Sequence, residues 1–334
     1  LAVDSRGVVF LATDEADDLP VYEDVSFNAG RNLVVASFTR EGGLRLHAAY
    51  RSTDIWGSYP TTLRVDDADR LWVGGAWRRS IPLSAESGSE QFSMALWRFP
   101  EVDATEPTMG NLGMSAHDRI EDLALPPGGA PLALGSRTLG AVRQGILYDA
   151  ELSPLRIFDD ISFLAGRLVT VDPAVFVALR LATAEGLDDG GLLLKLDDGF
   201  ATVTTQQVPE LTVHRLAADS SGQLVLGGMA GQRGAIQRFD AGLIPGPLAR
   251  TPESEEALDC PAMALQPPAD AWLACRRLTR PGIVLFRFQV GQPQDGVSLE
   301  VEGGDRPLDL LVDDAGVLWL AGLDGSHLLL WRFE

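Results

Sequence analysis

The chain has 334 residues, and its hydrophobic and charged fractions, 46% and 22%, are those of an ordinary globular protein. The formal net charge of −20 argues against nucleic acid and anionic membrane surfaces as partners, because both polyanions would repel the chain. No run of about 18 apolar residues occurs, so we expect no membrane-spanning segment.

One pattern recurs along the chain and predicts how it is organised. A short apolar-x-apolar run is followed by a turn rich in Asp, Pro and Gly and then by a second apolar run, which is the pattern of a β-hairpin. From Leu123 onward the pattern returns at intervals of about 47 residues, a period typical of repeat architectures. The predicted hairpins begin, in chain order, at Val25, Leu63, Leu123, Val169, Leu216, Met263 and Leu310.

Further strands follow each hairpin. We expect a third strand at 44–50, 93–99, 145–152, 192–198, 235–241, 283–290 and 328–334, and a weaker fourth at 155–160, 201–208 and 297–303. Four antiparallel strands in each of seven units predict an all-β fold, a seven-bladed β-propeller that forms a single domain over residues 1–334.

The two ends of the chain predict how this propeller closes. The last unit ends at Glu334, directly after its third strand, whereas residues 6–13 precede the first predicted hairpin at the spacing of a fourth strand. We therefore predict that this N-terminal strand completes the C-terminal blade and closes the ring, which leaves no open sheet edge.

Three of the units carry the most regular form of the repeat. They read AADSSGQLVLGG with AIQRF, VDDADRLWVGG with ALWRF, and VDDAGVLWLAG with LLWRF. This pattern resembles the delta-60 repeat propellers of bacterial secreted and surface proteins. The resemblance implies a secreted, periplasmic or cell-surface propeller, and it implies no set of catalytic residues.

Paired acids in the turns, such as Asp66-Asp67 and Asp313-Asp314, look like fragments of a calcium-binding loop. An EF-hand loop needs further oxygen ligands at set spacing and a closing Glu, and neither run has them. We therefore assign these acids to the turns.

The two cysteines lie in the sixth unit. If Leu265 faces Trp272 in its hairpin, residue 262 lies opposite Cys275, and Cys260 is about one diagonal step away. Such a placement allows a disulfide across the hairpin, and it equally allows two buried thiols. A disulfide would imply an oxidising compartment.

A binding site is expected where the loops are long. The second-to-third-strand loops and the blade connections share one face of a propeller, and those loops carry more Arg than acidic residues. Arginine and exposed aromatic side chains suit a protein, peptide or carbohydrate ligand, including an anionic one. The candidate binding residues are Trp56, Tyr59, Trp77, Arg78, Arg79, His117, Arg119, His214, Arg215, Arg276, Arg277, Arg306 and His327.

No nucleophile motif, phosphate-binding loop or metal-ligand spacing is found, so a non-enzymatic binding module without metal or cofactor is favoured. Two alternatives stay open. His117, His214 and His327 come from the third, fifth and seventh units and could converge in a metal-assisted hydrolase or lyase, with Asp118 and Asp305 nearby. The chain could also be a purely structural surface protein.

Overall fold

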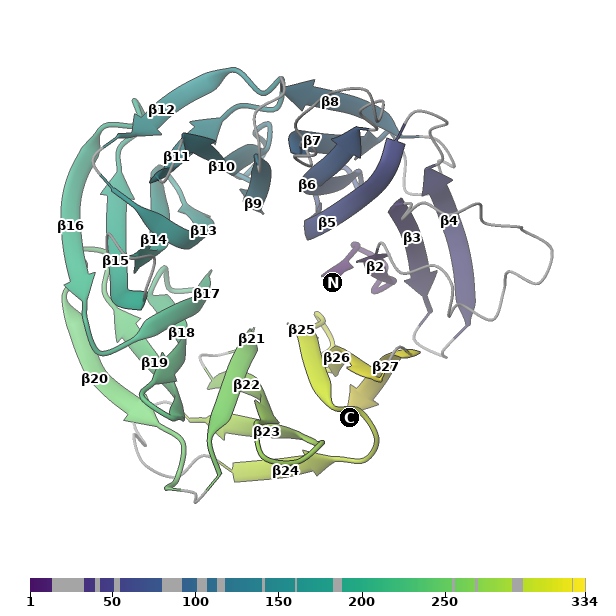
Figure 1. Cartoon of the computed structure of the whole chain (residues 1–334), viewed down its shortest axis with the longest axis vertical. Helices are drawn as coiled ribbons and strands as arrows, with labels where there is room; N and C mark the ends of the chain where they lie inside the picture. Colours follow the sequence, from purple (N-terminus) through teal and green to yellow (C-terminus); the bar gives the residue numbers. More distant parts are fainter. Residues whose placement is uncertain are drawn as a thin grey trace, which may run out of the picture. The chain divides into compact units, whose positions relative to one another are not determined.

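The computed structural model describes residues 1–13, 33–39, 43–50, 55–79, 92–100, 107–112, 118–139, 142–159, 161–182, 188–253, 256–267, 270–289, 297–325 and 327–333. Every regular element within these ranges is a β-strand, as Figure 1 shows. In this part of the chain no helix is present that is long and apolar enough to cross a membrane. The chain divides into two compact units, Leu1–Ser162 and Phe163–Glu334.

The first unit contains three four-stranded antiparallel sheets. The first sheet consists of β1 (Ala2–Val3), β2 (Val9–Thr13), β3 (Leu33–Phe38) and β4 (Leu44–Tyr50). The second consists of β5 (Ile55–Val65), β6 (Leu71–Arg79), β7 (Phe92–Phe99) and β8 (Thr108–Leu112). The third consists of β9 (Arg119–Ala124), β10 (Leu132–Leu139), β11 (Val142–Tyr148) and β12 (Pro154–Phe158).

The second unit contains three more four-stranded sheets and one three-stranded sheet. The strands of the fourth sheet are β13 (Phe163–Val171), β14 (Ala174–Ala182), β15 (Asp188–Leu196) and β16 (Thr202–Val208). Those of the fifth are β17 (Thr212–Ala218), β18 (Leu224–Ala230), β19 (Arg233–Phe239) and β20 (Pro245–Arg250). The sixth has β21 (Leu258–Gln266), β22 (Asp270–Arg277), β23 (Ile283–Phe288) and β24 (Val297–Val301), and the seventh has β25 (Arg306–Val312), β26 (Leu318–Asp324) and β27 (His327–Phe333).

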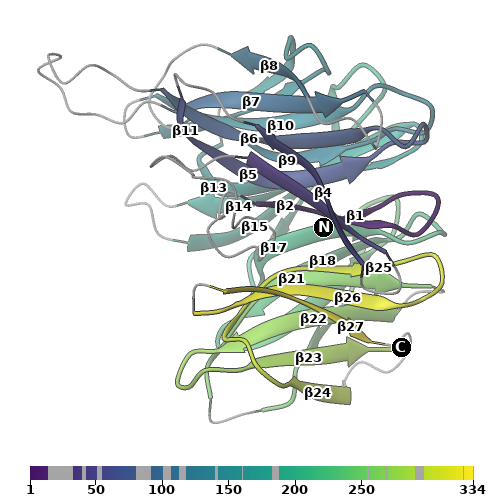
Figure 2. The ribbon, with the colours of Figure 1, turned by 90° about the vertical axis from the view of Figure 1, so that its right-hand side faces the viewer.

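The seven antiparallel sheets make the chain an all-β, seven-bladed β-propeller, which confirms the predicted fold class. Within each blade the strands are hydrogen-bonded in chain order, as Figure 2 shows for β21 to β24. The fourth strands expected at 155–160, 201–208 and 297–303 are present as β12, β16 and β24. The prediction that residues 1–334 form one domain stays a prediction.

The predicted role of the N-terminal strand is wrong. Strand β2 pairs with β3 and with β1 in the first blade, so residues 6–13 do not supply a fourth strand to the last one. Among the described residues, the 328–334 strand, β27, pairs with β26 alone. We expected the run that begins at Val25 to open the first blade. Its first residues lie outside the described part of the chain, and its remainder, from Leu33, forms β3, the third strand of that blade. The segment predicted as the first blade's third strand, 44–50, is its fourth.

The physical reason lies in the turn at Asp4. Its carboxylate accepts the backbone N–H groups of Arg6 and Val8, at 2.9 Å each. Asp66 accepts those of Ala68 and Arg70 in the same way, at the opening turn of the second blade. The VDSRG run at residues 3–7 is therefore the opening turn of the first blade, between β1 and β2, rather than the lead into a strand of the last blade.

The same Asp-initiated turn recurs at seven places in the described part of the chain. Its first residue is Asp, whose Oδ1 accepts the amides two and four residues later, and its fourth residue has a positive φ. It opens blades at Asp4, Asp66, Asp219 and Asp313, and it joins third to fourth strands at Asp149, Asp197 and Asp240. The first acid of each pair noted in the sequence, Asp66 and Asp313, therefore organises its turn, as predicted.

The core lies between consecutive sheets of each unit. One cluster joins the first and second sheets through Phe10, Leu33, Val73 and Trp97, and equivalent clusters join the other neighbouring sheets within each unit. A Cβ on Gly74 would lie 2.7 Å from Ile120 of the next blade, so glycine is needed for that close approach. Most of the site residues lie on the first strands of the sheets in the second unit.

Candidate functional site

Bulges in the first strands of the second unit create the site. Each bulge inserts an unpaired residue, which turns a side chain and leaves backbone groups without a ladder partner. The register shifts lie between Val213 and Arg215 in β17, between Asp259 and Ala262 in β21, and between Pro307 and Asp309 in β25. The carbonyls of the bulged residues then become acceptors for side chains of other blades.

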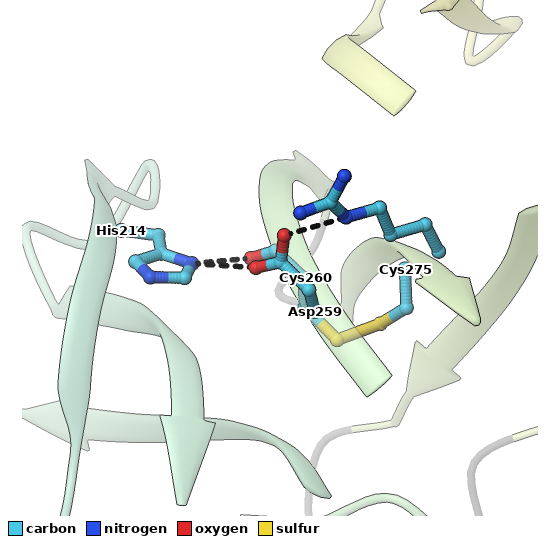
Figure 3. Close-up of a disulfide and its surroundings, with 5 residues drawn as sticks. His214, Asp259, Cys260 and Cys275 are labelled. Atoms are coloured by element: carbon cyan, nitrogen blue, oxygen red, sulfur yellow. Dashed lines mark hydrogen bonds and ion pairs between the residues drawn. A yellow bond between two sulfur atoms is a disulfide. The ribbon is translucent and has the colours of Figure 1, made fainter. Parts of the chain in front are cut away.

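Three side chains donate hydrogen bonds to these carbonyls. Arg167 Nε donates to the carbonyl of His214 at 2.7 Å. His214 Nδ1 donates to the carbonyl of Cys260 at 3.0 Å, as Figure 3 shows. Arg215 Nη2 donates to the carbonyl of Leu308 at 3.1 Å, which connects the fifth blade to the seventh. Four consecutive blades are thereby joined through their first strands.

Two carboxylates complete the arrangement. Asp259 accepts a hydrogen bond from Arg276 Nε at 2.8 Å, and its Oδ1 lies 4.0 Å from His214 Nδ1. Asp309 Oδ1 lies 3.3 Å from Arg215 Nη2. Both acids are partly exposed, and so are the two guanidinium groups that they hold. We call this set of residues the inter-blade network: Arg167, His214, Arg215, Asp259, Arg276 and Asp309.

A disulfide fixes the strand that carries Asp259. Cys260 and Cys275 are bonded, with an S–S distance of 2.00 Å, and both are fully buried. The disulfide considered from the sequence is thus confirmed. The hairpin register differs by one residue from the expectation, since Trp272 faces Ala264 rather than Leu265. The bulge between Asp259 and Ala262 then places Cys275 opposite residues 260 and 261.

Electrostatics keep the His214 ring neutral at pH 7. Burial lowers its pKa below the ordinary value of 6.5, and the positive charges of Arg180 and Arg167 act in the same direction. The carbonyl of Cys260 and the charge of Asp259 act against that shift and do not overcome it. A neutral ring that donates from Nδ1 must carry its lone pair on Nε2.

Arg119 belongs to a second charged group, in the third blade of the first unit. It holds the buried Glu121 through two hydrogen bonds, and Ser136 Oγ donates to the same carboxylate at 2.7 Å. Arg143 Nη1 lies 3.8 Å from Glu121. Burial lowers the pKa of Arg143, and the charge of Arg119 adds to that effect. Asp118, an acid named in the enzyme alternative, is buried and lies 3.4 Å from Arg137.

The predicted aromatic residues do not form an exposed rim where they are described. Trp77 packs against the hydrophobic cluster of the first two blades. Tyr59 is half-buried and lies edge-on to Phe92, with ring centroids 5.3 Å apart. For Trp56, Arg78 and Arg79 the structure describes only the backbone, in β5 and β6, and His117 lies outside the described residues.

The remaining candidates lie in the sixth and seventh blades. Arg277 is largely buried and forms ion pairs with Glu256, at 3.2 Å, and with Glu300 of β24 in its own blade. Arg306 and His327 are exposed at the starts of β25 and β27. The structure thus connects His214 to Arg276 through Asp259, and directs Arg215, the next residue along β17, to Leu308 and Asp309 of the seventh blade. None of the described contacts joins Arg277, Arg306 or His327 to these residues.

The metal-assisted alternative finds no support in the part of the chain that the structure describes. No group of three His, Cys, Asp or Glu residues there could hold a metal ion. His214 lies on the first strand of its blade and uses Nδ1 for a carbonyl, whereas His327 begins a third strand. Asp305 lies near the backbone amide of Gly325.

Sequence reasoning missed Arg167, Asp259 and Asp309. Their position in the repeat could have indicated them. All three lie on the first strand of a blade, before its opening turn, as His214 and Arg215 do in the fifth blade. Their partners are bulge carbonyls and residues of other blades, and no local pattern encodes bulges of this kind.

Comparisons with known proteins establish the fold alone. No family model matches the chain, and no curated protein matches it. A crystal structure of a protein from Lactobacillus plantarum is similar, with a TM-score of 0.60 at 12% identity over 98% of this chain and 92% of that chain. Hydrazine synthase from Kuenenia stuttgartiensis gives 0.58 at 11% identity, over 91% and 93%.

A structure of a puromycin hydrolase mutant gives a TM-score of 0.63 at 12% identity. The match covers 100% of this chain and 51% of the hydrolase, so the chain corresponds to about half the length of that enzyme.

Proposed function

We propose that the chain is a non-enzymatic binding module that holds an anionic ligand at the inter-blade network. The observation that carries this proposal is the local excess of positive charge. In the contacts described above, the network holds three guanidinium groups, of Arg167, Arg215 and Arg276, and two carboxylates, of Asp259 and Asp309, in a chain whose net charge is −20. Arginine is the residue best suited to bidentate recognition of carboxylate and phosphate groups.

The geometry supports a ligand that contacts the outer edges of the guanidinium groups. Arg215 and Arg276 each use one side of the guanidinium for an acid, and their side chains are 24% and 37% exposed. The bonds to Asp309 and Asp259 hold these cations in place before a ligand arrives, which reduces the entropic cost of binding. A protein, a peptide or a carbohydrate could each present the required anionic group.

A non-enzymatic role is favoured by the chemistry of the network. It contains no hydroxyl or thiol nucleophile, and the adjacent cysteines are joined in a disulfide. Its one imidazole donates to a backbone carbonyl rather than to a catalytic carboxylate. These features suit positioning of a ligand better than acid–base or covalent chemistry.

The proposed location is the bacterial cell surface, the periplasm or the extracellular space. A buried structural disulfide is typical of oxidising compartments. The delta-60-like pattern of the repeats points the same way, and membership of that group of propellers is part of the proposal.

An array of acidic and neutral glycans and peptides tests the function. We expect binding to acidic members only, weakening with added salt, and reduced at least about tenfold in Arg215→Gln and Arg276→Gln. Arg250→Gln is the matched control, because Arg250 pairs with the exposed Glu210 outside the network. Binding to neutral members alone, or equal binding by all variants, would contradict the proposal.

A further inference from the structure

The seventh blade differs from the other six at its outer edge. Within the described residues each of the other blades has four strands, whereas the seventh has β25, β26 and β27 only. In Figure 1, β24 lies outside β23 in the sixth blade, and β27 is the outermost strand drawn in the seventh. Because β27 pairs with β26 alone in the part of the chain that the structure describes, the outward backbone groups of residues 328–331 have no ladder partner there.

The sixth blade shows what such an edge accepts. Its third strand, β23, reads IVLFRF over residues 283–288, and β27 reads LLLWRF over residues 328–333. Strand β23 pairs antiparallel with β24, so that Leu285 faces Leu299. The residue of β27 equivalent to Leu285 is Leu330. Strand β27 therefore has the sequence of a strand that is paired on both sides in the neighbouring blade.

The burial of equivalent aromatic side chains differs between the two blades. Phe286 and Phe288 of β23 are 8% and 2% exposed, and they belong to the cluster that joins the fifth and sixth blades. Their equivalents in β27, Trp331 and Phe333, pack in the same way against the cluster of the sixth and seventh blades but are only partly buried. A strand beside β27 would cover them further, and this burial would add to the backbone hydrogen bonds.

Other outer strands of the second unit carry features that discourage pairing with a further strand. Strand β20 contains Pro245 and Pro247, which have no N–H to donate, and β16 consists mainly of Thr and Gln. Strand β27 has no proline and consists mainly of leucine and aromatic residues, with Arg332 as its one arginine. Its edge is therefore suited to accept a strand rather than to exclude one.

We propose that β27 binds an extended strand of a partner polypeptide, which completes the seventh blade as β24 completes the sixth. The partner strand runs antiparallel to β27, with apolar side chains at alternate positions and no proline, as in VSLEV at residues 297–301. Backbone hydrogen bonds supply the affinity, and the alternate side chains supply the specificity. A second copy of this chain is a poorer occupant, because each copy has a net charge of −20 and two copies repel each other.

Amide hydrogen exchange of the full chain tests whether the edge is open. Residues 284–287 of β23 should all be protected, because their amides face a strand on either side. Alternate amides within residues 328–331 should exchange at least about a hundredfold faster. Equal protection of the two strands in a monomer would overturn the proposal, since the chain then covers its own edge. Protection of β27 that appears with a dimer would overturn it as well, since the occupant is then a second copy.

The probe for the partner strand is the peptide GVSLEVEG, residues 296–303 of this chain. In an NMR titration of the full chain we expect a Kd of about 1 mM or lower, and slower exchange of the fast amides of β27. The matched control is the same peptide with Leu299→Pro, which loses a backbone N–H and should bind at least about tenfold more weakly. Equal binding of the two peptides, or binding of neither, would overturn the proposal.

A variant that fills the edge with its own strand shows where the peptide binds. A copy of residues 290–303 appended after Glu334 repeats the connection and the outer strand of the sixth blade at the same spacing. This variant should protect every amide of β27 and no longer bind the peptide. The same extension with Leu299→Pro should bind the peptide as the wild type does. Peptide binding that persists in the first variant would place the peptide elsewhere and overturn the proposal.

Discussion

Trp72 Nε1 donates a 2.9 Å hydrogen bond to Oδ2 of Asp66, the residue that begins the opening turn of the second blade. Trp319 and Asp313 repeat this bond in the seventh blade at 3.3 Å. In the sixth blade Trp272 donates to Gln266 instead, at 2.9 Å. The bond connects the turn to the second strand. In the second blade, the Asp66 carboxylate therefore accepts hydrogen bonds both from turn amides and from a side chain of β6.

Removing this carboxylate should destabilise the protein more than removing another turn acid. Asp66→Ala loses the acceptor for two amides, for Trp72 and for Arg70. We expect the free energy of unfolding to fall by about 3 kcal/mol, because buried donors are left unpaired. Asp149→Ala, in an exposed turn with two amides only, should cost about 1 kcal/mol. Urea denaturation of both variants measures the difference, and equal losses would contradict this ranking.

The same carboxylate should make stability depend on acid pH. Burial acts to raise the pKa of Asp66, but hydrogen bonds from Trp72, Arg70 and Ala68 outweigh it and hold that pKa below 3.8. The stabilisation is then fully present above the unfolded-state pKa of about 3.9, and it is lost as the pH falls through the lower folded-state pKa. The gap in unfolding midpoint between wild type and Asp66→Asn should therefore narrow as the pH falls below 4. A constant gap from pH 7 to pH 2.5 would show that ionisation of Asp66 is not involved.

Loss of the disulfide should weaken the sixth blade. The bond closes a loop of 15 residues, for which the chain-entropy model gives about 3 kcal/mol. Cys260→Ala with Cys275→Ala should lower the denaturation midpoint accordingly and speed amide exchange in β21. Mass spectrometry of the unreduced wild type should detect no free thiol. Unchanged stability in the double variant would mean that the disulfide does not constrain the bulge.

Glycine in the fifth blade should be irreplaceable at one position. A Cβ on Gly228 would lie 1.9 Å from the carbonyl oxygen of Thr212, so the first and second strands would have to separate. Gly228→Ala should destabilise the protein by about 3 kcal/mol or more. Gly246→Ala is the control, since its nearest neighbour, the carbonyl of Arg238, would lie 3.4 Å away. Thermal denaturation should separate the two, and similar melting temperatures would count against this packing.

The sequence predicts the repeat well because each blade is built from local signals. Turns rich in Asp, Pro and Gly, together with alternating apolar residues, place the hairpins of blades two to seven, and the seven-bladed fold follows from them. The first blade was misassigned because residues 6–13 were taken as a closing strand, although Asp4 begins a turn with the same bonding as Asp66. This turn was hard to recognise from the sequence because the strand before it, β1, has only two residues.

The candidate site was predictable only in part. His214, Arg215 and Arg276 were candidates because of their loop position and charge, and the structure places all three in the inter-blade network. Their partners are the carbonyls of Cys260 and Leu308, Asp309 of the seventh blade, and Asp259, which lies in the same blade as Arg276. Those contacts depend on bulges, which arise from packing between sheets rather than from residue order. The sequence also did not show that the partly buried Trp77 packs against the hydrophobic cluster of the first two blades.

A crystal structure of the full chain with D-glucuronate tests the central claim most directly. We expect the carboxylate of the sugar to lie within hydrogen-bond distance of a guanidinium group of the inter-blade network, Arg215 or Arg276. Sugar bound at another face of the molecule, or a network that stays empty at saturating ligand, would contradict it.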